Sequence, residues 1–115
     1  GASQVITASA DDTVEKIVHL MSGKGISQVP VVKKNEVSGL VSENELLNGL
    51  FTGKIKTKDK VGAIALNTFS VVKLEDDLEK ITQSLSAGVT PIVVHNNEIL
   101  ALITKIDLIN FLSKR

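Results

Sequence analysis

Two hydroxyl–acid pairs with the same spacing are the residues of this sequence best suited to bind a small molecule. Thr104 stands three residues before Asp107 in ALITKIDLINFL, and Ser42 stands three residues before Glu45 in GLVSENELLNGL. Residues with this spacing at the first turn of a helix lie on one face. A carboxylate offers two acceptor oxygens, which match the two donor hydroxyls of a ribose cis-diol. The same spacing is typical of a helix capping box, so both a cap and a ribose site remain open, and Thr104 can serve in both.

The two pairs differ in the length of the acidic side chain. Glu45 is one methylene longer than Asp107, so its carboxylate would be placed differently. We expect Glu45 to close a capping box or to meet a solvent lysine. The first pair is therefore predicted to form a degraded site that binds a ribose poorly or stays empty. Only the second pair is predicted to keep the groups that bind a ribose.

Catalytic and metal-binding motifs are missing from the sequence. The chain has no Cys, which excludes disulfides, thiolate nucleophiles and Cys-type zinc sites. His19 and His95 stand singly, with no Cys, Asp or Glu motif beside them, and we interpret them as surface residues. There is no Ser/His/Asp constellation and no glycine-rich phosphate loop. The sequence predicts that this chain is not itself an enzyme.

Charge and hydropathy restrict the partners. Thirteen basic and thirteen acidic residues give a formal net charge of zero, which argues against nucleic acid, because phosphate neutralisation needs a basic face. No apolar run is long enough to span a bilayer. We therefore expect a cytoplasmic protein that binds neither nucleic acid nor membrane.

An internal repeat positions the two pairs. Residues 36–50, EVSGLVSENELLNGL, and residues 98–112, EILALITKIDLINFL, are related by a constant offset of 62. Upstream, DDTVEKIVHLM corresponds to EDDLEKITQSL, and SQVPVV corresponds to VTPIVV. Each copy is too short to bury a stable core alone. The sequence predicts an α/β fold of two β-α-β-β-α repeats, related by a pseudo-twofold axis and packed sheet to sheet.

The element boundaries follow from local signals. Asp12 with Glu15, and Asp76 with Glu79, are predicted to form capping boxes at two helix starts, and Gly23 is predicted to end the first helix. The predicted strands are the leading strands 4–7 and 70–73 and the near-continuous apolar runs 29–32, 37–42, 92–94 and 99–103. The predicted module spans residues 1–115, with repeat 1 at 3–52, a polar linker at 53–61 and repeat 2 at 62–115.

The duplicated pattern of an apolar strand followed by Ser/Thr-x-x-acid at a helix start resembles a tandem CBS-domain pair, or Bateman module. The resemblance covers essentially the whole chain. The segments ISQVPVV, LLNGLFTGKIKTKDKVGAI and LITKIDLINFL are most similar to the C-terminal regulatory region of cystathionine beta-synthases.

The resemblance implies an adenosyl site in the cleft between the repeats. Several relatives place an aromatic residue and an acid where this chain has Ile26 and Ser27, so a stacking surface and a counter-charge for a sulfonium are lost here. The leading strand, at Ala2 to Gln4, would read the adenine edge. The ligand-binding residues implied are Thr104, Asp107, Leu102, Ile106, Gln28, Ser27, Ile26 and Val29.

The resemblance also implies a regulatory role. Such a module restrains a pyridoxal-phosphate catalytic domain that lies outside this chain, and S-adenosylmethionine relieves the restraint in some members. No cofactor is expected in the chain itself. The excess of apolar residues on the last helix of each repeat favours a homodimer through helices. Two alternatives are an AMP- or ATP-sensing pair attached to another enzyme or transporter, which Lys105 beside the second helix start would favour, and a ligand-free dimerisation or autoinhibitory unit.

Overall fold

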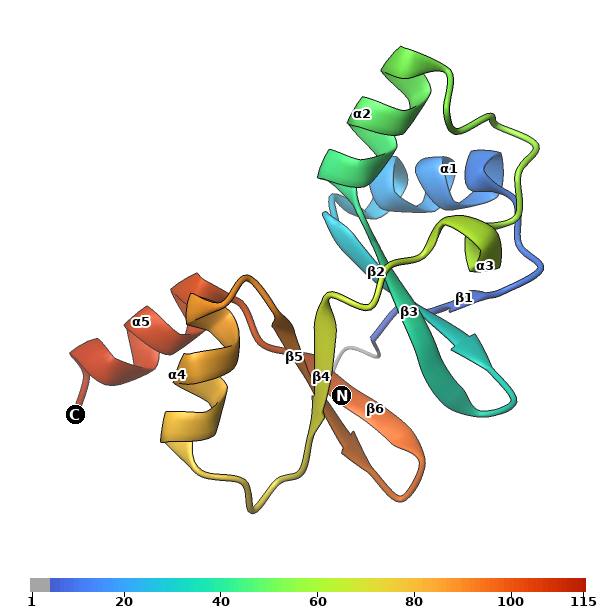
Figure 1. The fold of residues 1–115 in the computed structure, drawn as a ribbon. Coiled ribbons are helices and arrows are strands. Elements are labelled where there is room, and N and C mark those ends of the chain that lie inside the picture. Colours follow the sequence, from blue (N-terminus) through green and yellow to red (C-terminus); the bar gives the residue numbers. More distant parts are fainter. Residues whose placement is uncertain (1–4) are drawn as a thin grey trace. The chain divides into compact units, whose positions relative to one another are not determined.

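The computed structural model describes residues 5–115 as two compact units, shown in Figure 1. The N-terminal unit comprises Ile6–Asn67, and the C-terminal unit comprises Thr68–Arg115 together with Val5. Each unit has its own three-stranded sheet and its own helices, so we describe each by itself. No helix within residues 5–115 has the length and apolar character needed to cross a membrane.

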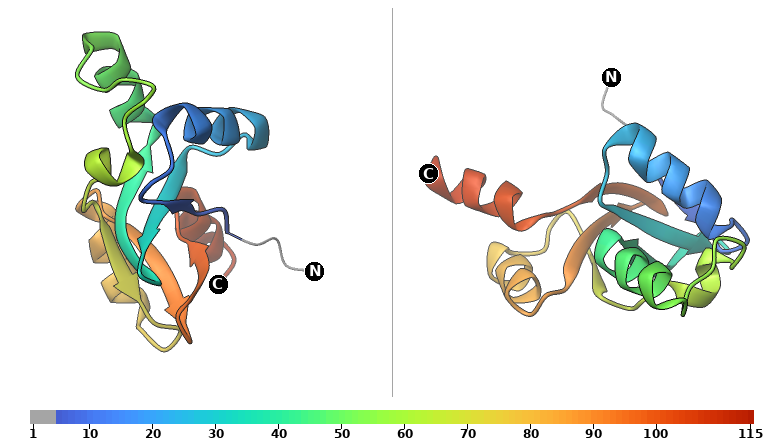
Figure 2. Two further views of the ribbon diagram at one scale, coloured as in Figure 1. Left: turned by 90° about the vertical axis from the view of Figure 1, so that its right-hand side faces the viewer. Right: turned by 90° about the horizontal axis from the view of Figure 1, so that it is seen from above.

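Both units contain the order β-α-β-β-α, and the N-terminal unit ends with one additional short helix. The N-terminal unit contains β1 (Ala8–Ser9), α1 (Val14–Lys24), β2 (Gln28–Lys33), β3 (Glu36–Ser42), α2 (Glu43–Thr52) and α3 (Val61–Ile64). The C-terminal unit contains β4 (Phe69–Val72), α4 (Leu78–Ser86), β5 (Thr90–His95), β6 (Glu98–Leu102) and α5 (Lys105–Ser113). In each sheet the first strand is parallel to the second and the second is antiparallel to the third. The predicted α/β repeat with β-α-β-β-α order is confirmed (Figures 1 and 2).

The two hairpins agree in detail. In the first, Val31 pairs with Gly39 and a bulge follows between Val31 and Val32. In the second, Val93 pairs with Ala101 and a bulge follows between Val93 and Val94. Both hairpins turn through two residues with positive φ, a conformation that Asn tolerates and that matches the twist of the strands. These residues are Lys34, Asn35, Asn96 and Asn97.

The first helix begins one residue later than predicted. Thr13, not Asp12, is its N-cap, and the Thr13 hydroxyl accepts from the backbone N–H of Lys16. Asp12 instead accepts a hydrogen bond from the backbone N–H of Ser9 at 2.9 Å and pairs with the Lys16 Nζ at 3.0 Å. The predicted Asp12–Glu15 capping box is therefore wrong. The Lys16 hydrogen bond, followed by that from Ser9, lowers the pKa of Asp12.

The second repeat shows the same displacement. Asp77, not Asp76, caps α4 by accepting from the backbone N–H of Lys80. Asp76 accepts from the backbone N–H of Lys73 and pairs with the Lys80 side chain, and the Lys73 bond is the larger cause of its lowered pKa. In both repeats the acid that precedes the N-cap accepts a hydrogen bond from a backbone N–H in the turn after the leading strand. One residue therefore stabilises the turn and the next caps the helix, which explains why two adjacent carboxyl or hydroxyl residues occur there.

Among the other predicted boundaries, the end of the first helix and the position of the first strand also differ from the structure, and the remaining strands differ by one or two residues at their ends. The first helix continues through Gly23 to Lys24 and ends at Gly25, whose φ of 64° is the left-handed conformation that glycine adopts without strain. The first strand comprises Ala8–Ser9 rather than residues 4–7. Ala8 pairs with Val31 and Ser9 with Val32. Position 4, and Ala2 to Gln4 as a whole, lie outside the described residues.

The connector after α2 is bonded to the first helix. The carbonyl oxygens of Asp59 and Thr57 accept from the N–H groups of Val14 and Glu15, at 2.8 and 2.9 Å. These N–H groups lie in the first turn of α1, where a helix leaves its donors without internal partners. The connector is polar and has no hydrophobic periodicity. Neither its docking on α1 nor the short helix α3 that follows could therefore be predicted.

Gly49 lets the connector return across α2. A Cβ at this position would lie under 3.0 Å from the Ile55 side chain, whereas a Cβ at Gly23 in α1 would meet nothing within 4 Å. We expect Gly49→Ala to lower the free energy of unfolding by about 1–3 kcal/mol through overpacking. The matched control Gly23→Ala should raise it by up to about 1 kcal/mol through helix propensity. Urea unfolding followed by circular dichroism measures both, and equal stabilisation by the two variants would contradict this account.

Candidate functional site

The joint between β6 and α5 carries the second hydroxyl–acid pair. Thr104 is the N-cap of α5 in extended backbone conformation, and its Oγ1 accepts from the backbone N–H of Asp107 at 3.2 Å. In return Asp107 Oδ2 accepts from the backbone N–H of Thr104 at 2.9 Å. The predicted capping role of this pair is confirmed. Both side chains are exposed.

The capping box leaves binding capacity at this joint. Asp107 uses Oδ2 for the cap, and within residues 5–115 no hydrogen bond to its Oδ1 is observed. Thr104 uses an oxygen lone pair for the cap and keeps its hydroxyl proton for donation. The two reciprocal bonds hold both side chains in fixed positions, so a vicinal diol would meet one preorganised acceptor and one preorganised donor.

Two apolar residues belong to the same joint. Leu102 is the last residue of β6, lies opposite Ile92 in the sheet and is half-buried. Ile106, in the first turn of α5, exposes 67% of its surface. Thr104, Asp107, Leu102 and Ile106 thus lie at one strand-to-helix joint, and their role in a binding site stays a prediction.

The other four predicted residues lie at the joint between α1 and β2. Ile26 is half-buried and packs against the core of the N-terminal unit, and Ser27 is exposed while its carbonyl accepts from the N–H of Glu43 at 3.0 Å. Gln28 begins β2 and is half-buried. Val29 is fully buried in the core and lies opposite Val41 in the sheet, so its side chain is not available to a ligand.

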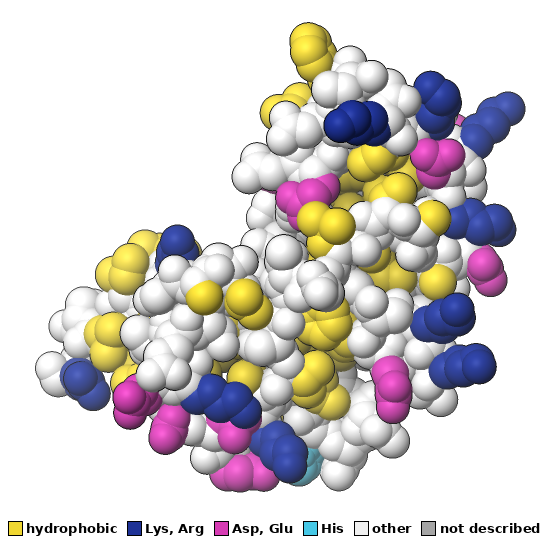
Figure 3. All heavy atoms as spheres, in the orientation of Figure 1, with side chains coloured by type: hydrophobic (Ala, Val, Ile, Leu, Met, Phe, Trp, Pro, Cys, Tyr) yellow, Lys and Arg dark blue, Asp and Glu magenta, His cyan; other side chains and the backbone are white. Residues whose placement is uncertain are grey.

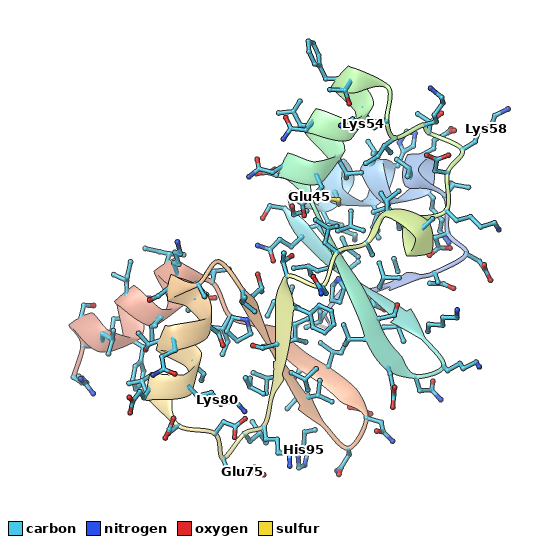
Figure 4. The ribbon with its side chains drawn as sticks, viewed as in Figure 1. Glu45, Lys54, Lys58, Glu75, Lys80 and His95 are labelled. Carbon is cyan, nitrogen blue, oxygen red and sulfur yellow. The ribbon has the colours of Figure 1, made fainter. Side chains whose placement is uncertain are left out.

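The first hydroxyl–acid pair, whose acid Glu45 is labelled in Figure 4, is organised differently from the second. Ser42 is the N-cap of α2 but makes no side-chain capping bond. Its hydroxyl donates instead to Glu45 Oε2, and Glu45 is half-buried. The predicted capping box or lysine contact of Glu45 is therefore wrong. The longer side chain brings the carboxylate to the serine hydroxyl rather than to the backbone N–H, and this bond occupies the proton that a ligand would need.

A groove between the two helices of each unit was not predicted. In the N-terminal unit a groove of about 430 Å³, here called the α1–α2 groove, is lined mainly by Val18, Met21, Ile26, Leu46 and Leu50. In the C-terminal unit a groove of about 820 Å³ between α4 and α5 is lined by more polar residues, among them Thr82, Gln83, Ser86, Leu112 and Arg115. The repeat could have indicated both, since Val18 and Thr82 occupy equivalent positions. Within residues 5–115, no three His, Asp or Glu side chains are grouped to hold a metal ion.

A family model and several curated proteins match the chain, among them cystathionine beta-synthases. Residues 2–51 match the model of the CBS-domain family. The chain is 33% identical over 119 residues to cystathionine beta-synthase of Dictyostelium discoideum, covering 95% of the chain and 23% of that protein. It is 26% identical over 117 residues to the rabbit (Oryctolagus cuniculus) enzyme, covering 90% of the chain and 21% of that protein. The chain thus spans about a fifth of the length of these relatives.

Solved structures share the fold. A signal-transduction protein with CBS domains from Burkholderia ambifaria aligns with a TM-score of 0.81 at 18% identity, covering 96% of this chain and 84% of that one. The CBS domain of a membrane protein from Sphaerobacter thermophilus aligns with a TM-score of 0.75 at 22% identity, covering 94% and 82%. At these identities the likeness concerns the fold alone.

Proposed function

The chain is a CBS-domain module, and from this premise we propose that it regulates a cystathionine beta-synthase-like enzyme by binding S-adenosylmethionine through the joint between β6 and α5. The similarity to two cystathionine beta-synthases supports the choice of parent enzyme. In this proposal the catalytic domain, with its pyridoxal phosphate, belongs to a longer protein, and the chain acts on it as a partner.

The observation that carries the proposal is the contrast between the two repeats. At the second joint a reciprocal capping box fixes Thr104 and Asp107 and leaves a carboxylate oxygen and a hydroxyl proton for a ligand. At the first joint Ser42 and Glu45 are bonded to each other. The proposal therefore assigns one ribose-reading position to the module.

The chemistry at this position follows from donors and acceptors. One ribose hydroxyl donates to Asp107 Oδ1, the carboxylate oxygen that the cap leaves unused, and the Thr104 hydroxyl donates to the other ribose oxygen. Hydrogen bonds to a charged group contribute about 1.5–3 kcal/mol each. Leu102 and Ile106 supply apolar contact beside the polar pair. Regulation requires that the ligand binds more tightly to one state of the parent enzyme than to the other.

Two observations favour a second candidate, an AMP- or ATP-sensing module attached to another enzyme or transporter. Ser27 is neutral where a sulfonium would call for an acid, and Lys105, the first residue of α5, is exposed beside Thr104. A phosphate would gain from the lysine and from the positive end of the helix dipole.

Thermal unfolding with a panel of ligands tests the proposal. S-adenosylmethionine at 100 times its Kd should stabilise the chain by about 2.7 kcal/mol, and methionine, which lacks the ribose, should give no shift. A shift with AMP or ATP but not with S-adenosylmethionine would favour the second candidate. No shift with any adenosyl compound would contradict both and would favour a ligand-free dimerisation or autoinhibitory unit.

A further inference from the structure

The connector and α3 complete the core of the N-terminal unit, whereas the core of the C-terminal unit is less complete. Val61 of α3 is completely buried, and so are Val14 and Ile17 of α1, which belong to the same cluster. Counted from the first residue of each helix, their counterparts in α4 are Leu78 and Ile81, which are only half-buried. Within residues 5–115, no segment after α5 takes the place that α3 has after α2.

The first turn of α4 has two backbone N–H groups without an observed acceptor. In α1 the first two N–H groups of the helix donate to the connector carbonyl oxygens of Asp59 and Thr57, at 2.8 and 2.9 Å. In α4 these groups belong to Leu78 and Glu79, and no hydrogen bond from either is observed among residues 5–115. A helix supplies no internal acceptor for them. They can therefore bind two carbonyl oxygens that lie two residues apart in an extended segment.

The turn before α4 shows the same contrast. In the N-terminal unit the carbonyl oxygens of Asp12 and Ala10 accept from the first two N–H groups of α3, at 2.8 and 3.0 Å. Counted back from the N-caps, their counterparts are Asp76 and Leu74, and no hydrogen bond to either carbonyl oxygen is observed in the described part of the chain. Leu74 also exposes 60% of its surface. We call this turn and the first turn of α4, up to Ile81, the α4 socket.

The charge around the α4 socket favours a basic segment. Residues 73–80 contain four acids and two lysines. Figure 3 shows acidic side chains gathered at the lower edge of the C-terminal unit. Lys80 pairs with Asp76, and the other three acids form no ion pair among the described residues. The connector, which covers the corresponding acidic turn of the N-terminal unit, has four lysines and one acid in residues 54–60, so a segment of its composition would meet opposite charge.

The repeat indicates which segment fills the α4 socket. In the N-terminal unit the covering segment, residues 53–67, leads directly into β4, the first strand of the other unit. For the C-terminal unit the corresponding segment is the one that leads into β1, and Val5, which precedes β1, belongs to the C-terminal unit. Ala8 and Val72 hold equivalent places in β1 and β4. Their offset of 64 puts the counterpart of residues 57–62 before residue 1.

We propose that the α4 socket is a peptide-binding site, and that it holds the extended, lysine-rich segment that leads into β1 in a longer protein. Two carbonyl oxygens of this segment accept from the N–H groups of Leu78 and Glu79. Two of its N–H groups donate to the carbonyl oxygens of Leu74 and Asp76, and a β-branched side chain packs on Ile81. The proposal rests on the proposed function only in assigning the chain to a longer protein, and it does not depend on which ligand binds.

Amide hydrogen exchange of the 115-residue chain tests whether the α4 socket is open. The N–H groups of Val14 and Glu15 should exchange at least about tenfold more slowly than those of Leu78 and Glu79, because only the first two are hydrogen bonded to a connector. Equal protection of the two pairs would overturn the proposal, since the α4 socket would then already be filled.

A synthetic peptide with the sequence of residues 53–67 is the probe for binding. Titrated into the isotope-labelled chain, it should shift the amide signals of Leu78 and Glu79 and slow their exchange, with a Kd below about 1 mM. The signals of Val14 and Glu15 should stay unchanged, because the connector of the chain itself is bonded there. Unchanged signals of Leu78 and Glu79, or shifts at Val14 and Glu15 instead, would overturn the proposal.

Two substitutions give a matched comparison for the peptide titration. Leu74→Lys places a cation against the lysine-rich peptide and removes apolar contact, so it should raise the peptide Kd at least about tenfold. Ile109→Lys, in α5, should leave the Kd unchanged. Leu74 and Ile109 expose 60% and 58% of their surfaces, so both variants should stay folded. Equal effects of the two substitutions on the Kd would place the peptide elsewhere and overturn the proposal.

The peptide and the adenosyl ligand are tested by separate measurements. A peptide with aspartate at the position of Val61 should bind at least about tenfold more weakly, because its branched apolar side chain is lost. Equal binding of the two peptides would contradict the packing on Ile81. Leu74→Lys should keep the thermal shift given by S-adenosylmethionine, so loss of peptide binding with a retained shift leaves the proposed function intact.

Discussion

Replacing Ile17 with alanine will lower the free energy of unfolding of the N-terminal unit by about 2–5 kcal/mol, the range for large-to-small substitutions in a packed core. Ile17 is completely buried. It lies in α1 at the centre of a cluster built from both helices, the sheet and α3, including Val14, Met21 and Val29. Each lost methylene removes a hydrophobic contribution and leaves a cavity that the surrounding β-branched residues are too stiff to fill.

Urea unfolding measures this loss. The urea concentration at the midpoint of unfolding should fall. The slope of the free energy of unfolding against urea concentration should stay the same, since the surface exposed on unfolding is unchanged. The matched control is Ile109→Ala, because Ile109 in α5 exposes 58% of its surface and the substitution should change stability by less than about 0.5 kcal/mol. Equal effects of the two substitutions would show that the core of the N-terminal unit is not where the structure has it.

If the chain binds an adenosyl ligand as proposed, replacing Asp107 with asparagine will weaken this binding by about 10- to 100-fold, equivalent to losing one or two charge-assisted hydrogen bonds. Asparagine keeps one carbonyl oxygen, which can still accept from the Thr104 N–H, so the helix cap survives and the loss is specific to the ligand. The charge and the second acceptor oxygen disappear.

The first repeat provides the control for this substitution. Glu45→Gln removes the equivalent charge at a joint whose Ser42 hydroxyl is already bonded to Glu45, and the ligand-induced thermal shift should remain as in the unmodified chain. The comparison of Asp107→Asn with Glu45→Gln therefore distinguishes a ribose contact from a general effect of charge. A shift lost in Glu45→Gln and kept in Asp107→Asn would reverse the assignment of the two repeats.

Much of this fold follows from the repeat in the sequence. The constant offset of 62 between the two strand-to-helix joints is reproduced in the hairpin register, where Val31 and Val93 precede equivalent bulges. Nearly continuous apolar runs predicted the central strands because both faces of these strands are covered. The Thr104–Asp107 capping box was predicted from spacing alone, since its two bonds are local to one turn of helix.

Sequence analysis did not predict the features that depend on contacts beyond one helical turn or on the exact length of a side chain. Two adjacent residues able to cap occur before α1, and the choice of Thr13 over Asp12 depends on the turn that Asp12 forms with Ser9. The connector docks on α1 because its carbonyl oxygens accept from N–H groups of the first helical turn that have no partner within the helix. These groups lie more than forty residues away in the sequence. The Ser42–Glu45 hydrogen bond forms because the Glu45 side chain is one methylene longer than that of Asp107. The spacing of the two residues indicates that their side chains can meet, but it does not indicate which atoms form the bond. That the residues around Ile26 and those around Thr104 share one ligand stays a prediction.

A calorimetric cycle between ligand and protein tests the central claim most directly. Adenosine and 2′,3′-dideoxyadenosine are titrated into the unmodified chain and into Asp107→Asn, so that the diol and the carboxylate are removed separately and together. If Asp107 reads the ribose, removing the diol will weaken binding to the unmodified chain at least about tenfold and will have little effect on Asp107→Asn. An equal loss in both chains would mean that the carboxylate and the diol do not meet, and the role assigned to the β6–α5 joint would be wrong.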